Sequence, residues 1–202
     1  MIGEILQGVD YFGTAVFAVS GALVADRKRM DLMGFLILAT VTGIGGGTLR
    51  DLLLDRPVFW LTHWEYLAIT AVMGLATFYV SKPLHQRANW LLWADAVGLA
   101  AFCVIGAQIA LSLEASPMIA VMMGIMTATF GGLIRDVLAG ELPLLLHREI
   151  YASAALAGGI VYVLLAHWLA WPIAAVVLGF IVTLVVRGLG IRYHWHLPSA
   201  GR

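Results

Sequence analysis

The sequence predicts an all-α integral membrane protein with seven transmembrane helices, arranged as an inverted repeat of two three-helix units plus a seventh helix. Three observations support this fold class. Hydrophobic residues make up 61% of the 202 residues and charged residues only 12%, whereas soluble domains carry roughly 25% charged residues. Apolar stretches long enough to cross a bilayer recur along the whole chain. The two halves also resemble each other at a constant offset of 85 residues, so that Asp95 in the second half is equivalent to Asp10 in the first.

The first four spans follow from a bilayer core about 30 Å thick, which about 20 helical residues cross. Charged or proline-containing segments separate the apolar stretches, beginning with Asp26-Arg27-Lys28-Arg29 and Asp55-Arg56-Pro57. Ser81-Lys82-Pro83 opens a third separator and Glu114-Ala115-Ser116-Pro117 forms a fourth. The predicted spans are 6–25, 32–54, 63–80 and 90–113.

The last three spans are 117–139, 149–167 and 171–188. Ser116 followed by Pro117 is a typical helix start, with an N-cap and a proline at the first helical position. Pro143 and Trp171-Pro172 mark the remaining boundaries. The chain is therefore expected to be one membrane domain, 1–202, with a first repeat at 6–80, a second repeat at 90–167 and an added span at 171–188.

Tryptophan and basic residues indicate how the chain sits in the membrane. All seven tryptophans lie at or just beyond a predicted span end, as an interfacial aromatic belt requires. With seven spans the termini lie on opposite faces. If Arg50 and Arg135 are set aside as intramembrane, nine basic residues fall on one face and one, Arg56, falls on the other. The nine are Arg27, Lys28, Arg29, Lys82, Arg87, Arg148, Arg187, Arg192 and Arg202. The positive-inside rule then predicts an external N-terminus and a cytoplasmic C-terminus in a multi-pass protein of the inner membrane.

The internal repeat contains thirteen identities, several of them Gly, Asp or Arg. The matched pairs are Asp10/Asp95, Gly13/Gly98, Phe17/Phe102, Gly21/Gly106, Ala22/Ala107, Thr42/Thr127, Gly46/Gly131, Gly47/Gly132, Arg50/Arg135, Asp51/Asp136, Leu53/Leu138, Tyr66/Tyr151 and Gly74/Gly159. Because each unit holds three spans, the two copies take opposite orientations. Inverted repeats are typical of transport proteins, although an old duplication could also leave only a scaffold.

Composition and motifs argue against other classes of function. Net charge is zero, so the chain lacks the basic face that a nucleic-acid partner needs. The single cysteine, Cys103, allows neither an internal disulfide nor a cysteine metal site. No catalytic or phosphate-binding motif is present in the sequence. We therefore expect no enzyme activity, no cofactor and no metal site.

A glycine-rich segment interrupts spans 2 and 5 at equivalent places. Span 2 contains Thr42 and then Gly45, Gly46 and Gly47, and span 5 contains Thr127 and then Gly131 and Gly132. Glycine weakens a helix by about 1 kcal/mol per residue, and freed backbone groups in a membrane need protein or cavity water. The segments therefore predict a bend with carbonyls turned toward a lumen. Close helix packing of the GxxxG type, which Gly43 and Gly47 fit, is the alternative.

Charged pairs follow both glycine segments: Arg50-Asp51 and Arg135-Asp136. An arginine within a span is costly unless it faces protein or water, so a functional site is predicted, with arginines that snorkel from the span end as the alternative. Asp10 and Asp95 are expected to pair with Arg50 and Arg135, respectively. The alternative for both is a first-turn acid favoured by the helix dipole.

Small residues recur every four positions in spans 1 and 4. Gly13, Phe17, Gly21 and Ala25 correspond to Gly98, Phe102, Gly106 and Ala110. A spacing of four places each set on one helix face, where small side chains permit close approach. This stripe predicts helix packing only.

At Gly45-Gly46-Gly47 and Arg135-Asp136-Val137 the chain resembles the prokaryotic branch of the trimeric intracellular cation (TRIC) channel family, over essentially its whole length. The resemblance implies a homotrimer with one potassium-permeable pore per protomer, lined by spans 2 and 5 and bent at the glycines. Membrane lipid and potassium and sodium ions are the implied partners. Arg135 stands where animal members carry lysine, and Phe130 replaces a third glycine in span 5, so that bend is expected to be milder.

Some bacterial relatives are described as transporters of glycine, which leaves a second interpretation open. A fixed arginine repels cations unless Asp51, Asp136, Asp10 or Asp95 offsets its charge. Arginine and broken-helix N-termini would instead suit an amino-acid carboxylate. The alternative function is therefore a secondary transporter of a small amino acid such as glycine, and a non-transporting membrane scaffold is a third.

Overall fold

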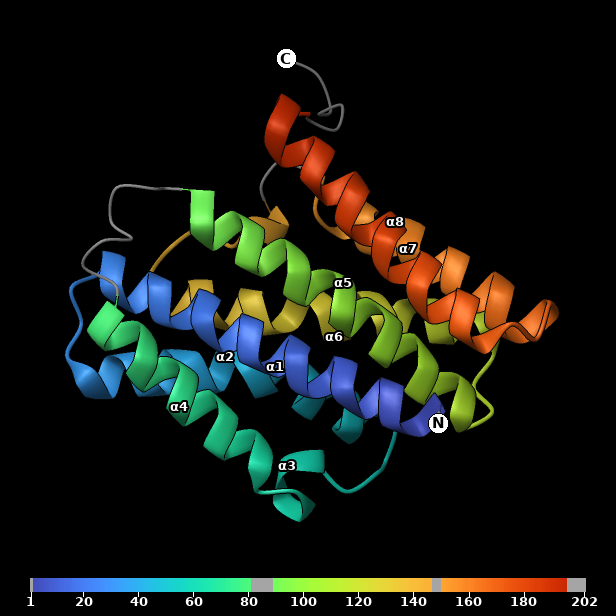
Figure 1. Ribbon diagram of the computed structural model, residues 1–202, viewed down its shortest axis with the longest axis horizontal. Coiled ribbons are helices and arrows are strands. Elements are labelled where there is room, and N and C mark those ends of the chain that lie inside the picture. Colours follow the sequence, from blue (N-terminus) through green and yellow to red (C-terminus); the bar gives the residue numbers. More distant parts are fainter. Residues whose placement is uncertain (1, 81–88, 147–149, 196–202) are drawn as a thin grey trace.

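The computed structural model describes residues 2–80, 89–146 and 150–195. Over these residues it is helical (Figure 1). Its elements are α1 (Ile2–Arg27), α2 (Leu32–Leu53), α3 (Phe59–Thr62), α4 (Glu65–Val80), α5 (Asn89–Ser112), α6 (Pro117–Leu138), the 3₁₀ turn η2 (Leu144–Leu146), α7 (Ala152–Val163), the π-helical turn η3 (Leu164–Trp168) and α8 (Pro172–Tyr193).

The seven predicted spans correspond to α1, α2, α4, α5, α6, α7 with η3, and α8. Five of these helices are long and apolar enough to cross a membrane, whereas Glu65–Val80 and Ala152–Trp168 are shorter apolar segments. The third span starts at Glu65 rather than at 63, because His63 still caps the end of the short helix α3. Helix α8 continues to Tyr193, past the predicted end at 188, and ends where His194 adopts a left-handed conformation (φ 53°).

The N-caps of α2 and α6 follow from their sequences. The Asp31 carboxylate accepts a hydrogen bond from the Gly34 amide at 2.9 Å, which satisfies one of the free amides at the start of α2. Ser116 accepts from the Ile119 amide at 3.5 Å, and Pro117 opens α6. The start predicted for this helix from Ser116 and Pro117 is therefore confirmed.

Helices α1 and α5 pack closely because glycine lies opposite an aromatic ring. A methyl group added at Gly98 would overlap the ring of Phe17, and one added at Gly13 would lie 2.9 Å from the Ala101 side chain. The rings of Phe17 and Phe102 meet at 5.1 Å between centroids. The small-residue stripes thus serve helix packing, as predicted.

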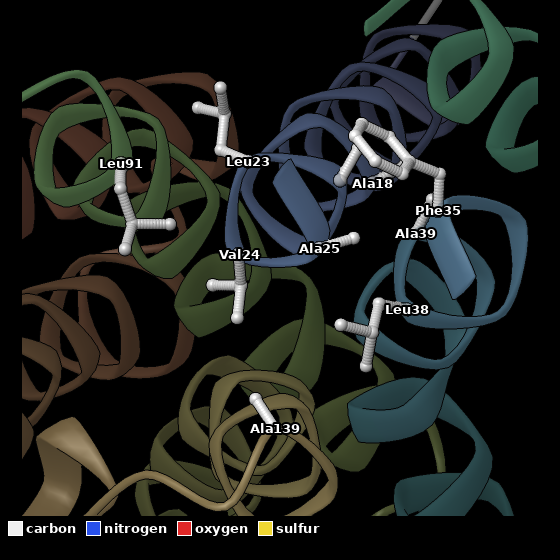
Figure 2. Close-up of a cluster of buried hydrophobic side chains, with 10 residues drawn as sticks. Ala18, Leu23, Val24, Ala25, Phe35, Leu38, Ala39, Leu91 and Ala139 are labelled. Carbon is white, nitrogen blue, oxygen red and sulfur yellow. The ribbon is translucent and has the colours of Figure 1, made fainter. Parts of the chain in front are cut away.

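A hydrophobic cluster closes one end of this bundle (Figure 2). Most of its members are small or medium-sized aliphatic residues from α1 and α2, joined by one residue each from α5 and the end of α6. They are Ala18, Ala22, Leu23, Val24, Ala25, Phe35, Leu38, Ala39, Leu91 and Ala139. The cluster packs the end of α6 against the first two helices.

Candidate functional site

Helices α2 and α6 touch where their glycines meet. A methyl group at Gly46 would overlap the carbonyl oxygen of Thr127, and one at Gly131 would lie 2.5 Å from the carbonyl oxygen of Thr42. Both helices continue without interruption through these residues. The glycines therefore provide close helix contact, but at Gly46 and Gly131 rather than at the predicted pair Gly43 and Gly47, which face Thr70 and Phe59. A bend at Gly45–Gly47 or Gly131–Gly132 stays a prediction.

The other glycines of the two segments meet side chains rather than backbone. A methyl group at Gly45 would lie 3.1 Å from the terminal carbon of Ile134, and one at Gly47 would lie 2.7 Å from the Phe59 ring. Gly132 faces a polar group of atoms: Tyr151 Oη, Asp95 Oδ1 and Arg135 Nη2 would lie 3.0, 3.3 and 3.4 Å from an added methyl group. Each glycine thus makes room for a specific neighbour.

The predicted supporting residues Thr42 and Thr127 are buried. The Thr42 hydroxyl donates to the carbonyl of Leu38 at 2.5 Å, and the Thr127 hydroxyl donates to the carbonyl of Met123 at 2.6 Å. Such bonds to the preceding turn satisfy the hydroxyl inside its own helix. The backbone carbonyls of both threonines, rather than their hydroxyls, face the opposite helix.

Arg50 and Asp51 form a buried ion pair at the end of α2. Arg50 Nε donates to Asp51 Oδ1 at 2.8 Å, and their side chains are 1% and 0% exposed. The second oxygen, Asp51 Oδ2, accepts from the amide of Phe59 at 2.9 Å. Asp51 therefore neutralises the arginine and also holds the start of α3. Burial of Arg50 inside the protein excludes a lipid-facing, snorkelling role.

The second pair repeats this geometry at the equivalent positions. Arg135 Nε donates to Asp136 Oδ1 at 2.8 Å, and Asp136 Oδ2 accepts from the amide of Leu144 at 2.9 Å. Leu144 begins η2, as Phe59 begins α3. In both halves an aspartate at a helix end thus joins its neighbouring arginine to the connection that follows.

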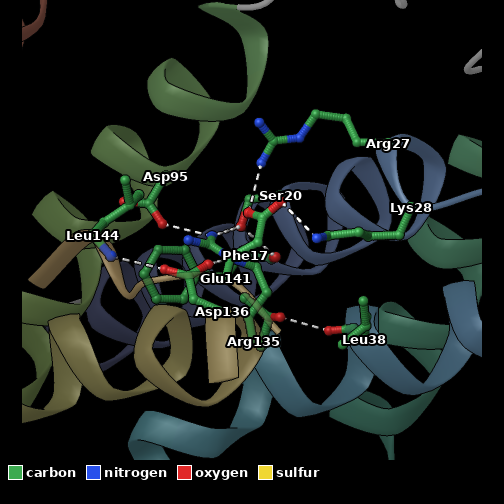
Figure 3. A network of polar contacts seen from close by, with 11 residues as sticks. Phe17, Ser20, Arg27, Lys28, Leu38, Asp95, Arg135, Asp136, Glu141 and Leu144 are labelled. Atoms are coloured by element: carbon green, nitrogen blue, oxygen red, sulfur yellow. Dashed lines mark hydrogen bonds and ion pairs between the residues drawn. The ribbon is translucent and has the colours of Figure 1, made fainter. Parts of the chain in front are cut away.

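Asp95 and Arg135 form the ion pair that was expected between them. Arg135 Nη1 donates to Asp95 Oδ1 at 2.7 Å, and neither side chain is exposed. The same nitrogen donates to the Ser20 hydroxyl at 3.0 Å, so three helices meet at this guanidinium (Figure 3). Asp95 lies in the second turn of α5 and is paired, so its role is not that of a first-turn acid.

Asp10 does not make the corresponding direct contact with Arg50. Asp10 Oδ2 instead accepts from the Tyr66 hydroxyl at 2.7 Å, while Arg50 bonds to Asp51. Arg50 Nη1 has no hydrogen-bond partner among the described residues. One physical reason is visible in the sequence: the position equivalent to Ser20 is Ile105, which offers no acceptor to the guanidinium.

Two polar clusters result, and we name each after its arginine. The Arg50 cluster comprises Asp10, Arg50, Asp51, Phe59 and Tyr66. The Arg135 cluster comprises Ser20, Asp95, Arg135, Asp136 and Tyr151. Asp10 and Ser20 are ten residues apart on α1, which corresponds to about 15 Å along a helix, so the clusters lie at different depths of the bundle.

Several members of these clusters were not predicted as site residues. Tyr66 and Tyr151 were matched in the repeat, and that identity of a polar aromatic residue was the available signal. Ser20 has no equivalent serine, so nothing in the sequence marked it. Arg187 was expected among the cytoplasmic basic residues, but it is fully buried on α8.

An exposed ion-pair group lies close to the Arg135 cluster (Figure 3). Glu141 pairs with Arg27 at 3.3 Å and with Lys28 at 3.2 Å. Because exposed pairs contribute about 0–1 kcal/mol each, these contacts mainly join the end of α1 to the connection after α6. The buried arginine and aspartate contacts dominate the electrostatics of the site.

Comparisons with known proteins give a consistent picture. A family model described as "Glycine transporter" matches twice, over residues 7–82 and 92–167. The inner membrane protein YadS of Escherichia coli K12, classed as UPF0126, is 45% identical over 95% of this chain and 94% of its own length. A UPF0126 membrane protein of Vibrio cholerae is 43% identical over 97% of this chain and 83% of its own length.

Solved structures agree with these sequence matches. The TRIC channel orthologue from Rhodobacter sphaeroides superposes with a TM-score of 0.91, at 45% identity over 95% of this chain and 99% of that chain. A prokaryotic TRIC channel in 0.5 M KCl gives a TM-score of 0.89, at 31% identity over 96% and 99% of the two chains. Both are described as TRIC channels.

Proposed function

Because the chain belongs to the prokaryotic branch of the TRIC channel family, we propose that it is a cation channel with an ion pathway along α2 and α6. One observation carries the proposal. The two helices pack against each other at glycines. Each helix also ends in a buried ion pair between an arginine and the aspartate that follows it. The coarse assignment of a multi-pass membrane channel rests on the similarity to the solved channels. Potassium permeability, glycine-dependent bending and the roles of single residues are finer proposals.

The arrangement of charge removes the objection that arginine repels cations. Each arginine donates its Nε to the aspartate next to it at 2.8 Å, so the local pair is neutral. Asp10 and Asp95 add one carboxylate to each cluster. In each cluster two aspartates stand against one arginine. A nearby cation would therefore not be repelled by a net positive charge from these residues.

The crossing of α2 and α6 is the proposed gate. In the structure the Gly46 and Gly131 backbones lie against the carbonyls of Thr127 and Thr42, which leaves no space between the helices for a hydrated ion. Bending at Gly45–Gly47 and Gly131–Gly132 would separate the helices and turn those carbonyls toward a water-filled path. Backbone carbonyls are ligands that suit potassium and sodium.

We also propose that two inverted units, 6–80 and 90–167, build this pathway. Two matches to one family model begin 85 residues apart, and Asp51 and Asp136 bond to amides that are also 85 residues apart. Without the buried Arg187, eight of the nine basic residues counted above still favour one face against Arg56 on the other, so the proposed topology places the N-terminus outside the inner membrane and the C-terminus in the cytoplasm.

Planar-bilayer recording of the purified protein tests the function. We expect unitary current steps in symmetric potassium chloride, and a reversal potential close to the potassium equilibrium potential under a gradient. The control is a mock preparation from the same host without the chain. Absence of current steps at any voltage, with protein shown to be inserted, would contradict the channel.

A carrier of glycine is the second candidate function. It is favoured by the description of the matching family model and by the buried Arg50 Nη1, which has no hydrogen-bond partner among the described residues and would suit a carboxylate. Uptake of labelled glycine into proteoliposomes distinguishes the two. Saturable uptake without current steps would support the carrier and reject the channel.

Water access between α2 and α6 provides a test of the pathway itself. Cys103 is buried, and its thiol contacts the Ala155 carbonyl at 3.0 Å, so Cys103→Ala gives a background without native cysteine. We expect single cysteines placed in 43–51 and 128–136 to react with a membrane-impermeant thiol reagent when the channel opens. The pathway is wrong if no position in either segment is labelled while cysteines in exposed loops are.

We propose that the protein assembles as a homotrimer in the lipid bilayer, as the solved relatives are described. The described part of the chain leaves many large apolar side chains exposed on α6 and α8, including Met118, Met122 and Val185, and lipid or a second subunit would cover them. Cross-linking in native membranes should reach a trimer and stop there. A series of cross-linked products that ends at a dimer would argue against this assembly.

A further inference from the structure

A buried arginine on the seventh span contacts the candidate site. Arg187 lies on α8, which falls outside both matched repeat units, 7–82 and 92–167. Its side chain is fully buried, and its guanidinium carbon lies 5.1 Å from the centre of the Tyr151 ring. Arg187 Nη1 also donates to the carbonyl of Ile150 at 3.0 Å. One side chain thus holds both the ring of Tyr151 and the backbone directly before it.

Tyr151 transmits this contact to the Arg135 cluster. Its hydroxyl, Asp95 Oδ1 and Arg135 Nη2 all surround the same point next to Gly132, within 3.0–3.4 Å of an added methyl group. Arg187 therefore lies over the ring of Tyr151, and the hydroxyl end of the same ring lies next to the Asp95–Arg135 ion pair. The hydroxyl has no hydrogen-bond partner among the described residues, so its contact with the pair is one of packing.

The equivalent tyrosine of the Arg50 cluster is held differently. Tyr66 donates to Asp10 at 2.7 Å and packs against the rings of Phe59 and Tyr11, with centroids 4.5 and 4.8 Å away. The arginine that lies over a ring in this cluster is Arg50 itself, 5.5 Å from Phe59. Helix α8 packs mainly on α5 and α7 (Figure 1), and its Arg187 contacts Tyr151 of the Arg135 cluster.

We propose that Arg187 is a positioning residue that locks Tyr151 against the Asp95–Arg135 pair and so stabilises the closed state of the Arg135 half. The inference deepens the proposed channel and rests on it. A cation over an aromatic ring in a desolvated setting is a favourable contact, and the hydrogen bond to Ile150 adds direction to it. In the closed structure α2 and α6 touch at Gly46 and Gly131, so losing the lock should favour the open state. The two halves would then differ in how easily they open.

Single-channel recording of position-187 variants tests the lock. Arg187→Met keeps an unbranched side chain, although a shorter one, and removes the contacts with Tyr151 and Ile150, so it should raise open probability about fivefold with unitary conductance unchanged. Arg187→Lys keeps the charge over the ring and loses the forked donor, so it should fall between wild type and Arg187→Met. Arg192→Met is the matched control, because Arg192 is exposed on the same helix and lies over Tyr193 rather than Tyr151.

A double substitution separates the lock from a purely structural role. In a Tyr151→Leu background the ring is absent and only the bond to the Ile150 carbonyl is left to lose, so adding Arg187→Met should raise open probability less than it does in the wild type. If Arg187→Met lowers only the thermal stability of the detergent-purified protein and leaves open probability and its voltage dependence at wild-type values, the lock is overturned while the channel stands. If wild type and all variants give no current steps, the channel proposal fails, and the lock fails with it.

Discussion

Arg135→Ala is expected to be the most damaging single substitution of a charged residue in the chain. It removes the cation from Asp95, whose side chain is not exposed and which Arg135 Nη1 contacts at 2.7 Å. It also leaves Asp136 and the Ser20 hydroxyl without the guanidinium. Removing one partner of a buried pair costs about 3–5 kcal/mol, because the remaining charge is buried without compensation. This loss of stability can be measured as a fall in the thermal unfolding temperature of the purified protein, with size-exclusion chromatography used to monitor the folded fraction after heating.

Arg50→Ala is the matched comparison. Arg50 makes the equivalent bond to Asp51 but has no direct contact with Asp10. Asp51 keeps the Phe59 amide and lies 3.6 Å from Arg56, which replaces part of the lost charge. We therefore expect a smaller loss of stability than for Arg135→Ala. Equal effects at both sites would contradict the asymmetry seen between the clusters.

Two further variants identify the cause of the Arg135 effect. Arg135→Lys keeps the charge but cannot bond to Asp95, Asp136 and Ser20 together, so its cost should be intermediate. Asp95→Asn in the Arg135→Ala background removes the unpaired carboxylate and should recover part of the stability. If Arg135→Ala has the same thermal unfolding transition and the same channel current as the wild type, the buried ion pair contributes neither to stability nor to conduction.

The sequence predicts the membrane architecture well because its signals are long and repeated. Seven apolar stretches, their polar separators and the identities between the halves need no knowledge of side-chain contacts. The capping pair Ser116 and Pro117 likewise acts locally, so its role could be recognised from neighbouring residues alone. The pairing of Asp95 with Arg135 was also accessible, because both are charged, both fall within spans and both recur in the other half.

The differences between the halves could not be predicted in this way. The repeat argument treats Asp10 and Asp95 alike, but Ser20 supports only the Arg135 cluster, and Tyr66 takes the carboxylate of Asp10. These contacts depend on which helix faces which side chain in three dimensions. Arg187 shows the same limit, since its position near the end of an apolar span is equally typical of an interfacial basic residue.

Gly46→Ala is expected to have the second largest effect, and it separates the two explanations of the glycine segment. A methyl group at Gly46 would overlap the carbonyl oxygen of Thr127, a backbone atom that cannot turn aside. Helices α2 and α6 would have to move apart, at a cost above the about 1–3 kcal/mol of ordinary overpacking. Gly131→Ala should behave in the same way, because its methyl group would lie 2.5 Å from the carbonyl oxygen of Thr42.

Gly45→Ala is the control beside it, one residue away in the same helix. Its methyl group would meet the terminal carbon of Ile134 at 3.1 Å, and the end of that flexible side chain can shift by a few tenths of an ångström. Alanine also favours the helix by about 1 kcal/mol relative to glycine, so Gly45→Ala should leave thermal stability near wild type.

Single-channel recording of both variants adds the functional test. If close packing is what α2 needs, Gly46→Ala alone changes stability and gating. If bending at the glycines is also needed, Gly45→Ala should fold normally but its channel should open less often. Equal losses of stability in Gly45→Ala and Gly46→Ala would contradict the importance of the contact between Gly46 and Thr127.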